Sequence, residues 1–116
     1  MAAPTIAAGL RQLLRAYMPF SSMAAEDIDF IIESVEIGYF APDEVVLAPS
    51  GKVPSHCMIV KQGRVQGEAP DKKGIAFEAG VGDCFPVGAL LAERPVTLTY
   101  RSVGDTFCLL LPRERF

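Results

Sequence analysis

The stretch FPVGALLAERPVTLTY, residues 85–100, is the part of the sequence that decides the fold. Its order of residue types predicts a turn, a short helix, a proline break and then a strand. VGALLAE, residues 87–93, is rich in good helix formers, and Pro95 ends the helix after about two turns. Because the segments on both sides have strand character, we expect one short helix to interrupt a β structure.

The start of this short helix is a candidate binding position. Backbone N–H groups in the first turn of a helix have no partner within the helix, so those around Gly88 and Ala89 are available to hold an anion. The ionisable side chains of the stretch are only Glu93 and Arg94. The stretch therefore has the pattern of a pocket wall with few charges.

Composition and charge exclude several classes of function. The 116 residues are enough for one domain with one core, and half of them are apolar. A net charge of −3 gives no general attraction to nucleic acid or to an anionic membrane. No apolar run approaches the roughly 18 residues of a membrane span. Arg11 and Arg15 interrupt the apolar residues of the N-terminus, unlike a secretory signal, so we expect a cytoplasmic protein.

The first 35 residues have helical patterns. Apolar residues recur at helical spacing over residues 5–18, which predicts one helix. SSMAAEDIDFIIESVE, residues 21–36, predicts a second helix with Ser22 as its N-cap. Glu26 and Asp27 lie in its first turns, where the helix dipole favours negative charge.

After Glu36 the pattern changes to short β-branched or aromatic segments separated by turn residues, which predicts an antiparallel sandwich or barrel. KQGRV, residues 61–65, is interpreted as a tight hairpin in which Gly63 adopts a positive φ. The expected strands lie near residues 36–40, 44–48, 56–61, 64–68, 75–79, 96–103 and 106–111.

Three motifs of this β region resemble those of cyclic nucleotide-binding domains. An opening pattern of the F-x-P-G-E-x-[IL] type is matched by Phe40, Pro42, Asp43, Glu44 and Val46, with aspartate in place of glycine. A second pattern, a glycine followed by Y-x-I-x-x-G-x-V, is partly matched by Gly51, Met58, Val60, Gly63 and Val65. The family's phosphate-binding cassette aligns without a gap at Gly82, Asp83, Phe85, Ala89, Leu90, Leu91 and Pro95.

The resemblance covers residues 36–116, about two thirds of the chain. It implies a mainly β fold with flanking helices: a cyclic nucleotide-binding-like β-roll, a jelly roll or double-stranded β-helix of about eight strands. An N-terminal helical element, residues 1–35, would precede the roll. A short cassette helix would interrupt it.

The departures from the cassette concern the groups that grip the ligand. In the family, a glutamate holds the ribose 2′-hydroxyl and an arginine holds the cyclic phosphate; Val87 and Val96 occupy these two positions here. Pro86 replaces the cassette glycine and lacks an N–H. Loss of one partner of a buried charge pair costs about 2–5 kcal/mol. We therefore predict that the chain does not bind cAMP or cGMP with the family's usual contacts.

Two arginines lie close to the cassette and are candidates to replace the family's phosphate-binding arginine. Arg94 should point away from the pocket because it lies near the end of the short helix, and Arg101 could face either way. A wall of valines suits a less charged or more apolar ligand, and a nucleotide or another small molecule is the possible ligand. The predicted pocket residues are Phe85, Val87, Gly88, Ala89, Leu90, Val96 and Thr97.

Other chemistry receives little support from the sequence. His56 is the single histidine, so a cupin-like metal site is not expected, and no serine or cysteine has the surroundings of a catalytic nucleophile. We therefore predict no enzymatic activity and no certain cofactor. Three cysteines separated by long gaps argue against a disulfide framework and are interpreted as buried apolar residues: Cys57, Cys84 and Cys108.

The resemblance also implies a regulatory role in a larger protein. PVGALLAERPV and FCLLLPRERF are similar to N-terminal modules of bacterial signalling proteins that also carry CBS and nucleotidyltransferase domains. We expect a sensor module that stops before the family's C-terminal helices and biases effector domains in the same chain. The alternative is a scaffold without a ligand, or a homodimerisation module that uses the apolar stripe of Leu10, Leu13, Leu14 and Tyr17.

Overall fold

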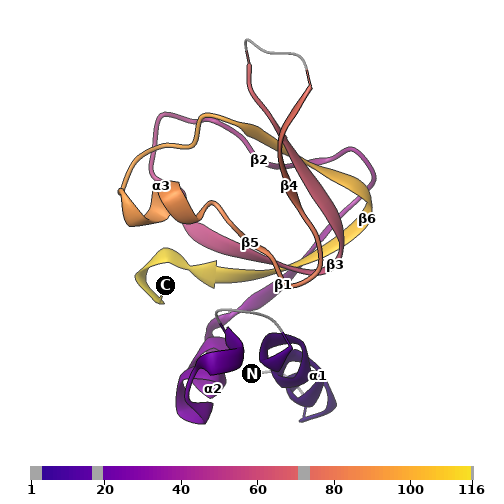
Figure 1. Ribbon diagram of the computed structural model, residues 1–116, viewed down its shortest axis with the longest axis vertical. Coiled ribbons are helices and arrows are strands. Elements are labelled where there is room, and N and C mark those ends of the chain that lie inside the picture. The colour runs from indigo at the N-terminus through magenta and orange to yellow at the C-terminus, as the bar shows by residue number, and fades with distance from the viewer. Residues whose placement is uncertain (1–3, 17–19, 71–73, 116) are drawn as a thin grey trace.

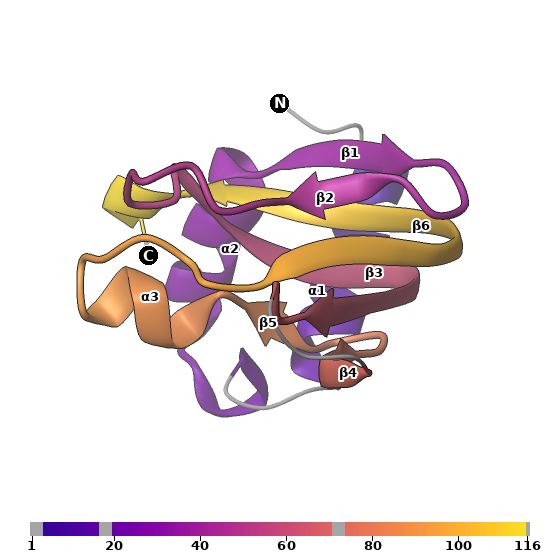
Figure 2. The ribbon, with the colours of Figure 1, turned by 90° about the horizontal axis from the view of Figure 1, so that it is seen from above.

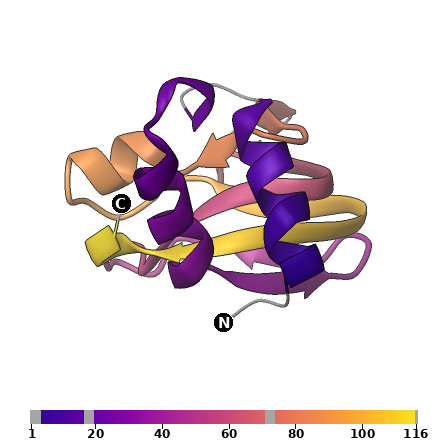
Figure 3. The ribbon, with the colours of Figure 1, turned by 90° about the horizontal axis from the view of Figure 1, so that it is seen from below.

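The computed structural model describes residues 4–16, 20–70 and 74–115. Two helices, α1 (Pro4–Arg15) and α2 (Ala25–Ser34), lie together on one side of a roll of strands, with the short 3-10 turn η1 (Phe20–Ser22) between them in sequence. Figure 3 shows both helices crossing the strands on that side. The predicted helix at 5–18 thus ends by Arg15 within the described part, and its last two positions lie outside the described residues.

The predicted N-cap of the second helix is wrong. α2 starts at Ala25 with Ala24 in the cap position, where no side chain accepts a capping hydrogen bond, while Ser22 ends η1. The acidic first turn is confirmed, because Glu26 and Asp27 both lie in it. The two helices are also joined by charge. The Arg11 guanidinium donates to the Asp29 carboxylate from both Nε, at 3.1 Å, and Nη2, at 2.6 Å.

The roll is one antiparallel sheet that curls over itself, as Figures 1 and 2 show. Its backbone order is β1–β6–β3–β4, with β2 paired to β6 and β5 paired to β3. The short helix α3 (Val87–Leu91) follows β5 directly. The strands are β1 (Glu36–Phe40), β2 (Val45–Leu47), β3 (His56–Glu68), β4 (Ile75–Ala79), β5 (Cys84–Phe85) and β6 (Thr99–Pro112).

The hairpin predicted at residues 61–65 is wrong. β3 continues through it as a single strand, and its pairing with β6 shifts register between Val60 and Arg64. Gly63 has φ +94°, and a Cβ there would lie 2.5 Å from the Asp105 carbonyl oxygen. Glycine is therefore needed for a β-bulge at which the paired strands β3 and β6 leave no room for a side chain, and the positive φ that resembled a turn belongs to this bulge.

The same reasoning corrects the strand count. β6 joins the two segments predicted at 96–103 and 106–111, with Gly104 at φ +74° inside it, and it begins only at Thr99. β1 has the predicted bounds, and β4 does as well. The fold class is confirmed: the chain is mainly β, with helices flanking a roll and a short helix inserted in it.

Two clusters of buried side chains hold these layers together. The first lies between the N-terminal helices and the roll, where Leu10 and Leu14 are each 1% exposed and pack with Ile28 and Leu109. The second fills the roll itself and includes Phe85, Val96 and Tyr100. Three residues of the stripe proposed for dimer contact, Leu10, Leu13 and Leu14, thus pack within the chain itself.

Within the described residues, no helix is both long and apolar enough to cross a membrane.

Candidate functional site

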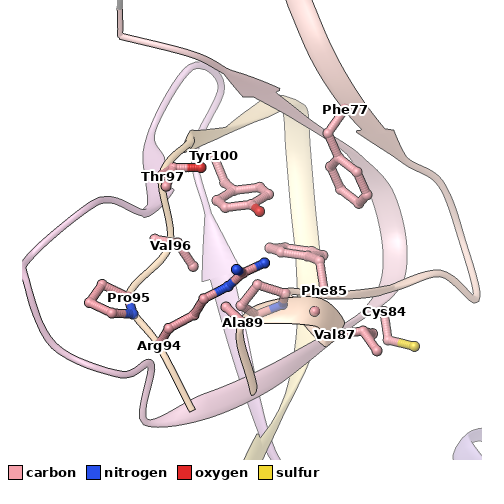
Figure 4. Close-up of a pocket in the computed structure, with 12 residues that line it drawn as sticks. Phe77, Cys84, Phe85, Val87, Ala89, Arg94, Pro95, Val96, Thr97 and Tyr100 are labelled. Carbon is pink, nitrogen blue, oxygen red and sulfur yellow. The ribbon is translucent and has the colours of Figure 1, made fainter. Parts of the chain in front are cut away.

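A pocket of about 450 Å³ opens between α3, the segment that follows it, and the rings of the roll interior (Figure 4). This volume is within the range of small-molecule sites. β5 supplies Phe85, α3 supplies Val87 to Ala89, and the chain between α3 and β6 supplies residues 94–97. The lining residues are Phe77, Cys84, Phe85, Pro86, Val87, Gly88, Ala89, Arg94, Pro95, Val96, Thr97 and Tyr100.

The structure brings six of the seven predicted pocket residues together in this lining: Phe85, Val87, Gly88, Ala89, Val96 and Thr97. Leu90 is placed elsewhere, which corrects the prediction for that residue. It is 5% exposed and packs in the cluster beneath α1 and α2, because a helix of only five residues must anchor one face in the core. That the other six bind a ligand stays a prediction.

Two aromatic residues of the pocket were missed by the sequence analysis. Tyr100 stacks on Phe85 with ring centroids 5.0 Å apart, and Phe77 meets Tyr100 edge to face at 5.6 Å. Burial raises the pKa of Tyr100. The strand alternation of residues 75–79 and the aromatic at the start of β6 were the available signals, but only the curl of the sheet brings these rings to α3.

The two valines that the cassette resemblance aligns with polar contact residues lie in the lining of the pocket. Val96 is 6% exposed and packs with the interior of the roll, and Val87 is half-buried at the start of α3. None of the lining residues carries a carboxylate. The lining therefore offers no acidic acceptor for a ligand hydroxyl.

The expectation for Arg94 is wrong. Arg94 lines the pocket, and Figure 4 shows its guanidinium directed inward, toward the rings of Phe85 and Tyr100. It is the only arginine, lysine, aspartate or glutamate among the lining residues. The wall is therefore not uniformly apolar.

Backbone geometry at the end of α3 explains the direction of Arg94. Glu93 has φ +51°, in the left-handed region, so the chain reverses after Ala92. The Arg94 N–H donates to the Ala89 carbonyl at 3.0 Å, and the Glu93 N–H donates to the Leu90 carbonyl at 3.3 Å. These two bonds form a Schellman motif, which closes the helix and turns the next residue back across it.

Arg101, the other arginine considered, lies outside this pocket. Its Nη1 donates to the Asp43 carbonyl at 3.4 Å, in the turn between β1 and β2. The sequence could not decide this orientation because it depends on the pairing of β2 with β6, in which Val45 is the partner of Arg101.

Gly88 faces open space. A Cβ at this position would meet no atom within 4 Å, and the residue is exposed. A need for close packing of the short helix therefore does not explain the glycine at this position. Close approach of a ligand stays a prediction.

One thiol also borders the pocket. Cys84 is half-buried in the lining, and a hydrogen bond from the Cys57 thiol lowers its pKa to about 7. The same contact, together with burial, raises the pKa of Cys57. Cys57 and Cys108 are buried as predicted, whereas Cys84 is a partly accessible thiol at a candidate site.

The fold of this chain is the β-roll of cyclic nucleotide-binding domains. The regulatory domain of Toxoplasma gondii protein kinase A, in complex with cAMP, superposes with a TM-score of 0.87 at 22% identity, over 100% of this chain and 45% of that one. The regulatory subunit of a cAMP-independent protein kinase A from Trypanosoma brucei matches 99% of this chain and 42% of its own, with a TM-score of 0.86 and 15% identity.

A third structure carries a different ligand. The regulatory subunit of a cAMP-independent protein kinase A from Trypanosoma cruzi, bound to guanosine, gives a TM-score of 0.85 at 15% identity, over 99% of this chain and 40% of that one. The chain thus spans less than half the length of these proteins. No protein-family model matches the chain, and no curated protein does.

Proposed function

We propose that this chain is a regulatory sensor module that binds a small molecule with an aromatic ring, without the family's glutamate and arginine contacts. The observation that carries the proposal is the pocket itself. Its shape and cassette helix remain, while Val87 and Val96 stand where the two polar contacts are expected. The proposed ligand site therefore keeps its wall and its ring-binding surface but differs in how it holds polar groups.

An aromatic ligand is supported by the rings that border the pocket. Flat rings pack favourably against aromatic side chains, and Phe85, Tyr100 and Phe77 already form a contiguous set there. Guanosine bound to the Trypanosoma cruzi structure shows that a nucleoside occupies a protein of this fold. A nucleoside is accordingly the first ligand class to test here.

The proposed setting is a larger bacterial, cytoplasmic signalling protein. The module would bias effector domains of the same chain, with CBS and nucleotidyltransferase domains as the candidates suggested by sequence resemblance. Neighbours described as regulatory subunits and domains support the regulatory part of this proposal. Burial of Leu10 and Leu14 makes a dimer through the N-terminal stripe the weaker alternative.

The test is a thermal-shift screen with nucleosides, including guanosine, followed by calorimetry. A ligand at about 100 times its Kd stabilises the native state by about 2.7 kcal/mol, which raises the melting temperature measurably. Thr97→Trp, at an exposed lining position, should block the mouth of the pocket and abolish the shift.

Leu91→Trp is the matched control, because Leu91 is 71% exposed and does not line the pocket. It should retain the wild-type shift. Absence of any shift across the screen, or an equal shift in the Thr97 variant, would contradict the proposal and favour a ligand-free scaffold.

A further inference from the structure

Arg94 faces the pocket, and within the described residues its side chain forms no hydrogen bond or ion pair. In the described part of the chain, the ion pairs join Arg11 to Asp29 and Arg64 to Glu78, and none includes Arg94. The lining contains no carboxylate that could compete for its guanidinium. A charged group held in this way is available to a ligand.

The position of Arg94 is set by the backbone. Glu93 holds a left-handed conformation that costs an L-residue about 1–2 kcal/mol, and the Schellman hydrogen bonds keep it there. The turn sets the direction in which the Arg94 side chain leaves the backbone, across α3 and toward the pocket. The side chain itself is exposed, so a ligand must still order it on binding.

The surroundings of the guanidinium favour an anion. Val96, Phe85 and Tyr100 are each at most 7% exposed, so one side of the site is a largely apolar wall, while Arg94 itself is open to solvent. Charge interactions are stronger beside such a wall than in open solvent. A guanidinium binds carboxylate or phosphate oxygens through two parallel hydrogen bonds, which a neutral ligand cannot offer.

We propose that Arg94 supplies the anion contact of this pocket, so that its ligand is an aromatic compound with one phosphate or carboxylate group. The inference rests on the proposed function and deepens it. Arg94 lies two residues before Val96, so the positive charge reaches the pocket from the end of the cassette helix rather than from the residue after Pro95. This arrangement revises the sequence-based expectation of a less charged or more apolar ligand.

The test compares two probes that differ only in charge and phosphate: guanosine and guanosine 5′-monophosphate. Calorimetry on the wild-type chain should give about tenfold or greater preference for the monophosphate, since a charge-assisted contact contributes about 1.5–3 kcal/mol. The preference should shrink at high salt because the site is open to solvent. Arg94→Gln should reduce the preference to about one while leaving guanosine affinity within roughly twofold, because only the charge contact is removed.

Arg101→Gln is the matched control, since it removes the same charge outside this pocket and should keep the preference. Equal affinities in the wild type, or a preference that survives Arg94→Gln, would overturn the inference and leave the proposed function standing. A gain in guanosine affinity in Arg94→Gln would also overturn it, by showing that Arg94 blocks the pocket. Binding of neither probe would overturn both.

Discussion

The backbone N–H of Arg94 donates a hydrogen bond to the carbonyl oxygen of Ala89 at 3.0 Å, across the left-handed residue Glu93. This hydrogen bond closes the end of α3 and turns the Arg94 side chain toward the pocket. Residue 93 is thus a position where a backbone change should alter binding without touching the pocket.

Substitutions at Glu93 test this connection. Glu93→Gly keeps the positive φ at little steric cost, so the stability and nucleotide affinity should stay near wild type. Glu93→Pro fixes φ near −65° and removes the N–H that bonds to Leu90, so it should destabilise the chain by about 3 kcal/mol. Denaturant unfolding and calorimetry measure both effects. A proline variant with wild-type stability and affinity would contradict the role of the turn.

The two polar contacts that the cassette resemblance implies can be introduced by substitution. Wild-type protein should bind cAMP more weakly than micromolar, and Val87→Glu combined with Val96→Arg should raise its affinity. Each restored charged contact contributes about 2–5 kcal/mol, or about 30- to 4,000-fold, less the cost of placing charge in an apolar wall. Val103→Arg, at a 39% exposed position of β6, adds charge elsewhere and should have no effect. Micromolar cAMP binding by the wild type, measured by calorimetry, would refute the reading of the two valines.

The thiol of Cys84 should be the first of the three to react with iodoacetamide. Its pKa is lowered to about 7, so its thiolate fraction rises as pH passes through 7, whereas burial raises the pKa of Cys108 to about 11. Peptide mass mapping across a pH series should show half-maximal reactivity of Cys84 near 7. A pocket ligand should slow the reaction, and Cys84→Ser should remove the fast phase. Preferential labelling of Cys108 would contradict the assignment.

Substitutions at Gly63 and Gly51 test how closely β3 and β6 pack at the bulge, with Gly51 as the matched control. Both have a positive φ, but a Cβ at Gly63 would meet Asp105 and Thr106 below 3 Å, while one at Gly51 would meet nothing within 4 Å. Gly51→Ala should cost about 1–2 kcal/mol for the φ alone. Gly63→Ala should cost clearly more, about 3 kcal/mol or above, because backbone must also shift. Urea unfolding of both variants measures the loss of stability, and equal losses would show that β3 and β6 leave room for a side chain at residue 63.

The N-terminal helix should behave as part of the core. Leu14→Ala removes a side chain that is 1% exposed and should cost about 2–5 kcal/mol. Leu91→Ala, at 71% exposure, should change stability by at most about 0.5 kcal/mol. Light scattering should give the same mass for both variants and the wild type. A change of oligomeric state in the folded Leu14 variant would instead support the dimerisation alternative.

Local chemistry along the chain determined a large part of this structure. Helix formers at residues 87–91, the period of the apolar residues in α1 and α2, and the turn residues around β1 and β4 each act within a few positions. The correspondence of Val87 and Val96 to the two contact positions of the cassette likewise follows from the spacing of the sequence alone. These features were therefore predictable, together with the fold class and six of the pocket-lining residues.

Only the tertiary structure decided the features that depend on contacts between distant segments. The long antiparallel pairing of β3 with β6 places Gly63 in a bulge rather than in a hairpin turn, and the curl of the sheet brings Phe77 to Tyr100. Arg94 lies in the pocket lining because Glu93 has a left-handed backbone conformation, which hydrogen bonds to α3 stabilise. Sequence patterns report the preferences of single segments, while these three outcomes depend on the energy of packing one segment against another.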